Sequence, residues 1–279
     1  MKKFMKWAGI FLGGLVGLLL LACLVLYFVG LGKLSKTYPS IPVETVSVPT
    51  GADGVSRGGH VAIVWACEKC HGDNLGGSPA NSLNSETTLM GTVPAPNLTS
   101  GDGGIGTTYT DADWVRAIRH GVKPDGHAEI SMYNYWPLSD QDLGDLIAYL
   151  KQLPLVDASY PAPSVGALYA IVAGAGLEIP AAAEINHSAP RPTASAPAAS
   201  AEYGAYLYTM CLGCHSANFY RRIAPMKQDD FARTMRTGVM PNGDHLSEAM
   251  TTKNFAAMTD TELAALWLYA QNAQSNAKQ

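Results

Sequence analysis

The sequence predicts an all-α protein in which two helical domains stand in tandem behind an N-terminal transmembrane helix. Three observations predict it: a long uncharged segment near the N-terminus, amphipathic helix patterns that recur in both halves, and no run with the alternation typical of strands. A chain of 279 residues is long enough for one large or two small domains. The net charge of −4 gives no reason to expect a nucleic-acid partner.

The first element is the uncharged run over residues 7–32, which three lysines precede. At 1.5 Å per residue this run can cross roughly 30 Å of hydrocarbon, and it is longer than the apolar core of a cleaved signal. We therefore expect residues 1–32 to be an uncleaved, single-pass signal-anchor in a bacterial cytoplasmic membrane. The lysines place the N-terminus in the cytoplasm and the rest in the periplasm. A competing interpretation is the lipoprotein-like box LLAC (20–23), which leaves open whether Cys23 is lipidated.

The rest of the chain divides by composition. Residues 33–50 are expected to be an extended tether, and residues 51–153 a first domain. Residues 154–200 are rich in Ala, Pro and Ser, and their prolines argue against a long helix, so we expect a linker there. Residues 201–275 are expected to form a second domain. The apolar stretch 167–177 is too short to span a bilayer and predicts a short helix packed on a domain.

An internal repeat relates the two domains. DWVRAIRHGVKPDG (113–126) aligns with DFARTMRTGVMPNG (230–243), and LSDQDLGDLIAYL (138–150) aligns with MTDTELAALWLYA (258–270). The second pair places leucines and their equivalents at i, i+3, i+4 and i+7, the stripe of an amphipathic helix. The second residue of each copy is Ser139 or Thr259, and three residues later stands Asp142 or Glu262, a pattern that caps a helix N-terminus. Both domains are therefore predicted to be helical and alike.

Four of the five cysteines lie in two copies of one motif, CxxCH, within ACEKCHG (66–72) and MCLGCH (210–215). A structural zinc site would place two such pairs some 15–20 residues apart, and a redox dithiol would sit in a strand–helix–strand context. The histidine directly after each second cysteine favours the covalent attachment of a c-type haem. Two covalently bound haem c groups are therefore expected, with these thiols and iron ligands: Cys67, Cys70 and His71 in the first domain, and Cys211, Cys214 and His215 in the second.

The repeat also suggests the second iron ligand. Met132 and Met250 occupy equivalent positions just before the last helix of each domain. A methionine is more often core packing than a ligand, but the equivalence favours ligation opposite His71 and His215. Met90 lies in a segment that the second copy lacks, so it is the weaker candidate.

Four further residues are predicted around the irons. The carbonyl groups of Pro96 and Pro225 could accept the N–H of the ligating histidine and fix its ring. Arg119 and Arg236 are equivalent in the repeat and could pair with haem propionates, although a solvated helix arginine explains them equally well.

Two segments of the first domain carry a resemblance to a known family: NLTSGDGGIGTTYTDADWVRAIRHGVKPDG (97–126) and MYNYWPLSDQDLGDLIAYLKQLP (132–154). They resemble the membrane-associated multihaem cytochromes c that serve periplasmic dehydrogenases, such as the cytochrome subunits of alcohol and aldehyde dehydrogenases. The second domain matches at CLGCH (211–215) and FARTMRTGVMPNG (231–243). Those subunits usually carry three CxxCH motifs and a cleaved signal, whereas this chain has two motifs and an apparent anchor.

These observations predict a membrane-anchored dihaem cytochrome c that carries single electrons between a periplasmic or membrane donor and an acceptor of a respiratory-type chain. It is expected to be an electron-transfer protein rather than an enzyme, either free-standing or as the electron-accepting subunit of an oxidoreductase complex. Expected partners are a redox donor and acceptor, such as a periplasmic dehydrogenase or a membrane oxidoreductase complex, and no nucleic acid. The alternative is a haem enzyme such as a peroxidase, which requires that Met132 is not a ligand.

Overall fold

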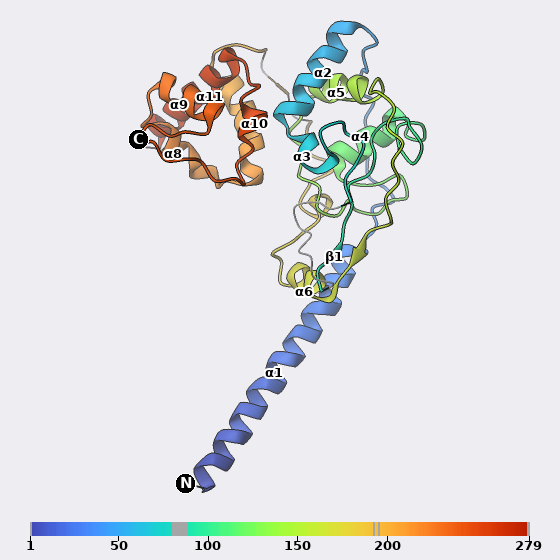
Figure 1. Cartoon of the computed structure of the whole chain (residues 1–279), viewed down its shortest axis with the longest axis vertical. Coiled ribbons are helices and arrows are strands. Elements are labelled where there is room, and N and C mark those ends of the chain that lie inside the picture. The colour runs from blue at the N-terminus through green and yellow to red at the C-terminus, as the bar shows by residue number, and fades with distance from the viewer. Residues whose placement is uncertain (1, 80–88, 192, 195, 278–279) are drawn as a thin grey trace.

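The architecture is that of two helical bodies at one end of a long helix (Figure 1). The computed structural model describes residues 2–79, 89–191, 193–194 and 196–277. Within these residues the only strands are two short ones, β1 (Gly91–Thr92) and β2 (Ser164–Val165), which pair antiparallel. The predicted all-α class is confirmed.

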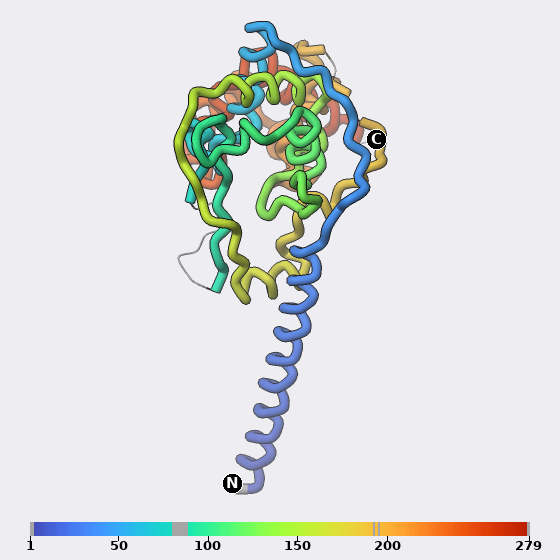
Figure 2. The backbone as a smooth tube through the Cα atoms, turned by 90° about the vertical axis from the view of Figure 1, so that its right-hand side faces the viewer, coloured from blue at the N-terminus to red at the C-terminus, as the bar shows by residue number. Residues whose placement is uncertain are grey.

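Helix α1 (Lys2–Leu34) projects away from the rest of the molecule as a single rod (Figures 1 and 2). Most of its large apolar side chains are exposed, from Phe4 to Val29. By length and composition it can cross a membrane. Such a surface is stable in water only if something apolar covers it, which makes α1 a candidate membrane anchor.

Among the described residues, the first helical body contains four helices: α2 (Ala52–Val64), α3 (Cys67–His71), α4 (Asp111–His120) and α5 (Asp140–Leu150). Helix α5 begins at the predicted cap, where the Ser139 hydroxyl accepts the backbone N–H of Asp142. Its leucine stripe, from Leu143 to Leu150, is buried against the rest of the body. Helices α2 and α5 pack closely, and a Cβ at Gly58 would lie 1.9 Å from the carbonyl oxygen of Asp145.

The second body repeats this arrangement with α7 (Ala201–Tyr208), η2 (Thr209–Gly213), η3 (Ala217–Phe219), α8 (Tyr220–Ile223), α9 (Gln228–Thr237), α10 (Thr252–Phe255) and α11 (Asp260–Asn276). Thr259 and Glu262 form the predicted capping box of α11. The close crossing recurs as well, because a Cβ at Gly204 would lie 1.9 Å from the carbonyl oxygen of Ala265. The repeat in the sequence is therefore a repeat in helix packing.

The segment expected to be a tether, 33–50, is packed against the first body. Val46 is buried in the core, and the Glu44 carboxylate accepts hydrogen bonds from Arg119 and His120. Burial on its own would raise the pKa of Glu44, but these two hydrogen bonds lower it to about 2. The segment therefore holds the domain close to α1.

The first part of the expected linker, 154–200, also belongs to the first body. The Val156 carbonyl accepts a hydrogen bond of 2.6 Å from the Asn97 amide, and β2 pairs with β1. The predicted short helix at 167–177 is α6 (Ala167–Gly174), and it packs on α1. A one-turn helix, η1 (Ala181–Ala183), follows it.

The two bodies lie against each other and share one continuous apolar core. Polar contacts join them: His60 Nε2 lies 2.9 Å from Glu262, and the Asn254 amide donates to the Ile63 carbonyl at 2.8 Å. The Tyr206 hydroxyl donates to the Asp142 carboxylate within the same interface. These contacts fix the two bodies in one relative position.

Candidate cofactor sites

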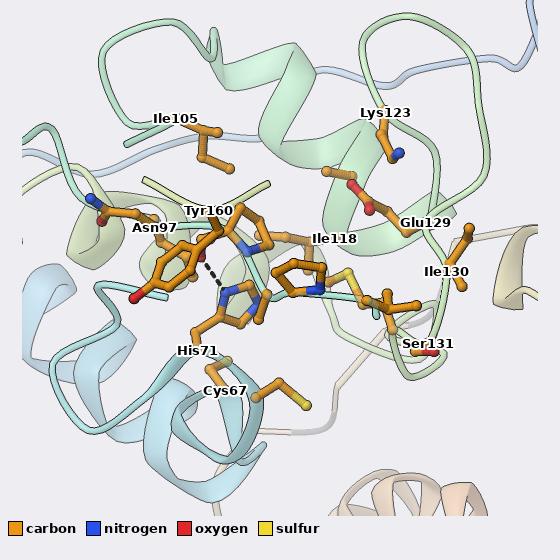
Figure 3. Close-up of a pocket in the computed structure, with 18 of the residues that line it drawn as sticks. Cys67, His71, Asn97, Ile105, Ile118, Lys123, Glu129, Ile130, Ser131 and Tyr160 are labelled. Carbon is orange, nitrogen blue, oxygen red and sulfur yellow. Dashed lines mark hydrogen bonds between the residues drawn. The ribbon is translucent and has the colours of Figure 1, made fainter. Parts of the chain in front are cut away.

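The first CxxCH motif opens onto a cavity of about 380 Å³ in the first body. This volume lies in the range of small-molecule and cofactor sites, roughly 300–1,000 Å³. In Figure 3, Cys67 and His71 enter from α3, while Ile105 and Ile118 face them across the cavity. The cavity is lined mainly by apolar groups, with the motif on one wall.

The local backbone explains how the motif is presented. Ala66 has a left-handed φ of 58°, which separates α2 from α3 and starts a new helical turn. Cys67 and Cys70 stand three residues apart and therefore share one face of that turn. The His71 Nδ1–H donates to the Pro96 carbonyl at 2.8 Å, the contact that the sequence predicted. This bond leaves Nε2 of His71 as the nitrogen available to a metal.

The protonation states also suit a covalent cofactor. Burial lowers the pKa of His71 despite its hydrogen bond to Pro96, so the imidazole is held neutral, as ligation of iron requires. Burial raises the pKa of the Cys67 thiol to about 12 and raises that of Cys70. A redox dithiol would have lowered thiol pKa values. The electrostatics therefore argue against a redox dithiol.

Met132 lines the same cavity as the first motif, whereas Met90 packs beside Tyr169 and Leu34, away from it. The wall also includes Tyr160 and residues 161–163, which the sequence analysis had assigned to the linker. No signal in the sequence could have identified these wall residues, because the second copy has no equivalent segment.

One end of the cavity is polar, with Lys123 and Glu129 on its wall (Figure 3). Burial raises the pKa of Glu129 above its ordinary value. Trp114 also lines the cavity, and its buried Nε1–H has no hydrogen-bond partner in the described part of the chain. An ammonium group and an unpaired donor on the wall of an apolar cavity suit the carboxylates of a haem. Sequence reasoning had not selected these three residues.

The second motif opens onto a second cavity, of about 300 Å³. Cys211, Cys214, His215 and Met250 all line it, as the repeat predicted. Burial raises the pKa of the Cys211 thiol to about 12, and burial followed by the charge of Arg222 lowers that of His215. His215 Nε2 is buried and, within the described residues, has no hydrogen-bond partner. A buried ring nitrogen without a partner is costly, and a bound iron would remove that cost.

Three of the predicted supporting residues are placed differently from the expectation. The His215 ring stacks on Phe219 at 3.7 Å, and no hydrogen bond to Pro225 is among its described contacts. Arg119 is buried away from the cavity and donates to the Leu138 carbonyl at 2.8 Å, in addition to its bond with Glu44.

Arg236 lies on the surface and pairs with Asp260 at 2.5 Å. Both arginines instead stabilise the start of the last helix of their body: Arg119 contacts Asp140, and Arg236 contacts Asp260. The propionate role for this pair therefore stays a prediction, which these contacts do not support.

The two cavities have a wall in common. Tyr133 and Tyr135 line both of them, and Trp65 lines the second. The Tyr135 hydroxyl donates to the Trp65 carbonyl at 3.2 Å, and the two rings are 6.0 Å apart. A single layer of aromatic side chains therefore separates the two sites.

The residues present fit haem c at both sites. Each cavity combines two thiols on one side of a helical turn, a neutral histidine beside them and a methionine elsewhere on the wall. Nitrogen and thioether donors of this kind are common axial ligands of haem iron.

Comparison with known proteins agrees with this geometry. Residues 55–154 match the family model for cytochrome c. The chain is 29% identical over 141 residues to the fructose dehydrogenase cytochrome subunit of Gluconobacter japonicus, covering 49% of this chain and 29% of that protein. It is 33% identical over 110 residues to a diheme cytochrome c-type protein of Cereibacter sphaeroides, covering 37% of each.

The matches thus span about a third of the length of these relatives. The predicted resemblance to c-type cytochromes of dehydrogenases is confirmed.

Proposed function

We propose that the chain is a dihaem cytochrome c that carries single electrons. The observation that carries the proposal is the pair of cavities, each lined by a CxxCH motif and by a methionine that the repeat makes equivalent. The residues that would hold the two haems are Cys67, Cys70, His71 and Met132 in the first body, and Cys211, Cys214, His215 and Met250 in the second.

Bound haem c supplies reversible one-electron chemistry, and a methionine ligand raises its reduction potential. A methionine on the wall of each cavity is the feature expected of a carrier, in which protein side chains take both axial positions. A peroxidase needs a vacant or displaceable position for its substrate. The position of Met132 in the first cavity therefore favours a carrier over an enzyme.

The surrounding residues prepare the sites for this role. Pro96 fixes the ring of His71, and Tyr133 and Tyr135 form a wall that the two sites share, which keeps the sites close. The contact between His60 and Glu262 helps to hold the two bodies together. Two sites in a fixed arrangement with one shared wall support electron exchange within the chain.

The location and partners are also proposals. Helix α1 would anchor the chain in a bacterial cytoplasmic membrane, with the N-terminus in the cytoplasm and both bodies in the periplasm. A relative named as a cytochrome subunit of fructose dehydrogenase supports a dehydrogenase, or a related membrane oxidoreductase, as electron donor. Co-purification from detergent-solubilised membranes, followed by mass spectrometry, would identify that partner.

The haem count tests the proposal directly. The full chain, expressed with a cytochrome c maturation system, should gain the mass of two haems that survive denaturation and acid–organic extraction. Cys67→Ala/Cys70→Ala and Cys211→Ala/Cys214→Ala should each retain one haem, and the two variants should have distinct potentials. A gain of one haem or none in the unaltered chain would refute the proposal.

A further inference from the structure

An apolar segment that the electron-transfer sites do not use lies beside the upper end of α1. It runs over residues 166–179 and includes α6. Between Tyr160 and Glu178 the chain has no charged residue. Leu177 is 77% exposed, and Leu168 and Ile179 are also exposed. Apolar side chains gathered at one place on a surface indicate a contact with another apolar surface.

Helix α6 is docked tightly on α1. A Cβ at Gly30 would lie 1.7 Å from the Ala170 carbonyl oxygen, and one at Gly174 would lie 1.9 Å from the Leu26 carbonyl oxygen. The Lys33 ammonium donates to the carbonyls at the end of α6, at 3.1 Å to Ala173 and 3.2 Å to Gly174. Small residues that bring two backbones into contact are typical of helix pairs in membranes. The position of α6 relative to α1 is therefore fixed.

The position of this contact along α1 gives its depth. The uncharged run of α1 begins at Trp7, and about 20 residues at 1.5 Å each span a hydrocarbon core of roughly 30 Å. The helix would therefore leave the core near Tyr27. Contacts at Leu26, Gly30 and Lys33 place α6 at the membrane surface, and Figures 1 and 2 show the segment at the base of the first body.

We propose that residues 166–179 form a second membrane contact, with Leu168 and Leu177 inserted among the lipids of the outer leaflet. The proposal rests on the proposed anchoring by α1. Its occupant is lipid, because the exposed leucines of the segment lie beside the end of the apolar helix α1; Lys33 of α1 and Glu178 of the segment are the charged residues there. Each leucine side chain that leaves water for lipid favours the contact, because its apolar surface is then removed from water.

The contact would also orient the first cofactor site. The Tyr169 hydroxyl of α6 lies 3.0 Å from the Ser131 hydroxyl, and Ser131 lies on the wall of the first cavity, directly before Met132. Ser131 has a left-handed φ of 65°, so the loop is held in one specific conformation there. The segment therefore connects the methionine loop of the first site to the membrane surface, and it would set the height of that site above the bilayer.

Fluorescence quenching in vesicles tests the proposal on the full, haem-loaded chain. In a Cys23→Ser background, an environment-sensitive NBD probe is attached at Leu177→Cys, and separately at Leu168→Cys. The matched control is Leu155→Cys, since Leu155 is a 71% exposed leucine that follows α5 and does not line either cavity. Each variant is reconstituted in phosphatidylcholine–phosphatidylglycerol vesicles. Quenching by nitroxide-labelled lipid and by aqueous iodide is then measured relative to the unquenched signal, which cancels constant quenching by haem.

The two probes on the segment should be quenched by lipid nitroxide at least twofold more than the Leu155 probe, and by iodide at least twofold less. Iodide quenching equal to that of the control would overturn the proposal. So would shielding from both quenchers, which would indicate that protein covers the segment instead. Flotation of the vesicles distinguishes failure of the anchoring by α1 from failure of the second contact. A chain that does not float with lipid refutes both proposals, whereas a chain that floats but has water-exposed probes refutes only the second contact.

Discussion

The crossing of α2 and α5 gives a quantitative test of the fold. Gly58 lies where the two helices come closest, and its missing side chain is what permits the approach. A Cβ there would lie 1.9 Å from the Asp145 carbonyl oxygen and 2.8 Å from Cβ of Tyr149. The first obstacle is backbone, so it cannot turn aside. Gly58→Ala therefore requires the helices to separate by about 1 Å or more, with loss of packing along the whole crossing.

The magnitude follows from two opposing effects. Overpacking of this kind costs about 1–3 kcal/mol, and a backbone obstacle places the cost at the upper end of that range. Alanine in place of glycine inside a helix returns up to about 1 kcal/mol. The net expectation is a loss of about 2 kcal/mol, which lowers Tm by about 4–8 °C for two bodies that share one core.

Gly59→Ala is the matched control, because it makes the same exchange one residue along the same helix. Its Cβ would meet only the Tyr149 ring, at 3.2 Å, and a ring edge can move. This variant should be as stable as the unaltered chain or up to about 1 kcal/mol more stable. Thermal unfolding followed by circular dichroism and by haem absorbance measures both. If the two variants have the same Tm within about 2 °C, the close crossing does not limit stability and the reasoning is wrong.

Three further predictions concern the sites and the interface. Met132→Ala should turn one haem high-spin and lower its reduction potential on the order of 0.1 V, within the roughly 0.8 V that axial ligands span. Met90→Ala should change neither the spectrum nor the potential. The opposite result would make Met90 the ligand. Trp114→Phe should leave the ligand spectrum unchanged but lower the reduction potential of the same haem on the order of tens of millivolts, because the substitution removes a buried N–H donor. An unchanged potential in a redox titration would contradict this prediction. The hydrogen bond to Glu262 raises the pKa of His60 above 6.5. Burial on its own would raise the pKa of Glu262, but the hydrogen bonds that Glu262 accepts, first the one from His60, lower that pKa below 4.5. The pair should therefore stabilise the interface most between about pH 4.5 and 6.5; the His60 contribution is lost as pH rises through its folded pKa, the Glu262 contribution as pH falls through its own. Tm of the unaltered chain, measured from pH 4 to 9, should fall on the alkaline side, and His60→Gln should remove this fall. An identical alkaline fall in the unaltered chain and the variant would show that other groups cause it.

The features that the sequence predicted are those with a local cause. The cap at Ser139 and the stripe that follows it specify a helix from neighbouring residues alone, and α5 begins where they place it. The CxxCH motif is also local, since two thiols and an imidazole within five residues share one helical turn. Met132 is distant in sequence, but the repeat supplied a second copy of the same fold, and the structure places it on the wall of the first cavity.

The arginine pair shows what a sequence repeat leaves open. Arg119 and Arg236 are indeed equivalent, but their shared role is to bind the acidic start of the last helix. An alignment establishes that two residues do the same thing without establishing what they do. The partner of Arg119 in the tether, Glu44, has no counterpart in the second body, so the repeat could not have indicated it.

By itself the sequence determined the helical class, the long apolar helix, the doubled motif and the cytochrome c character, because each is encoded by residues close together or by a repeated pattern. Only the tertiary structure decided that the expected tether and linker are parts of the first domain, that Tyr160 lines its cavity, and that Tyr133 and Tyr135 divide the two sites. These are contacts between segments far apart in the chain. They depend on shape and on the burial of apolar surface, which favours any close-packed arrangement without specifying in the sequence which segments will meet.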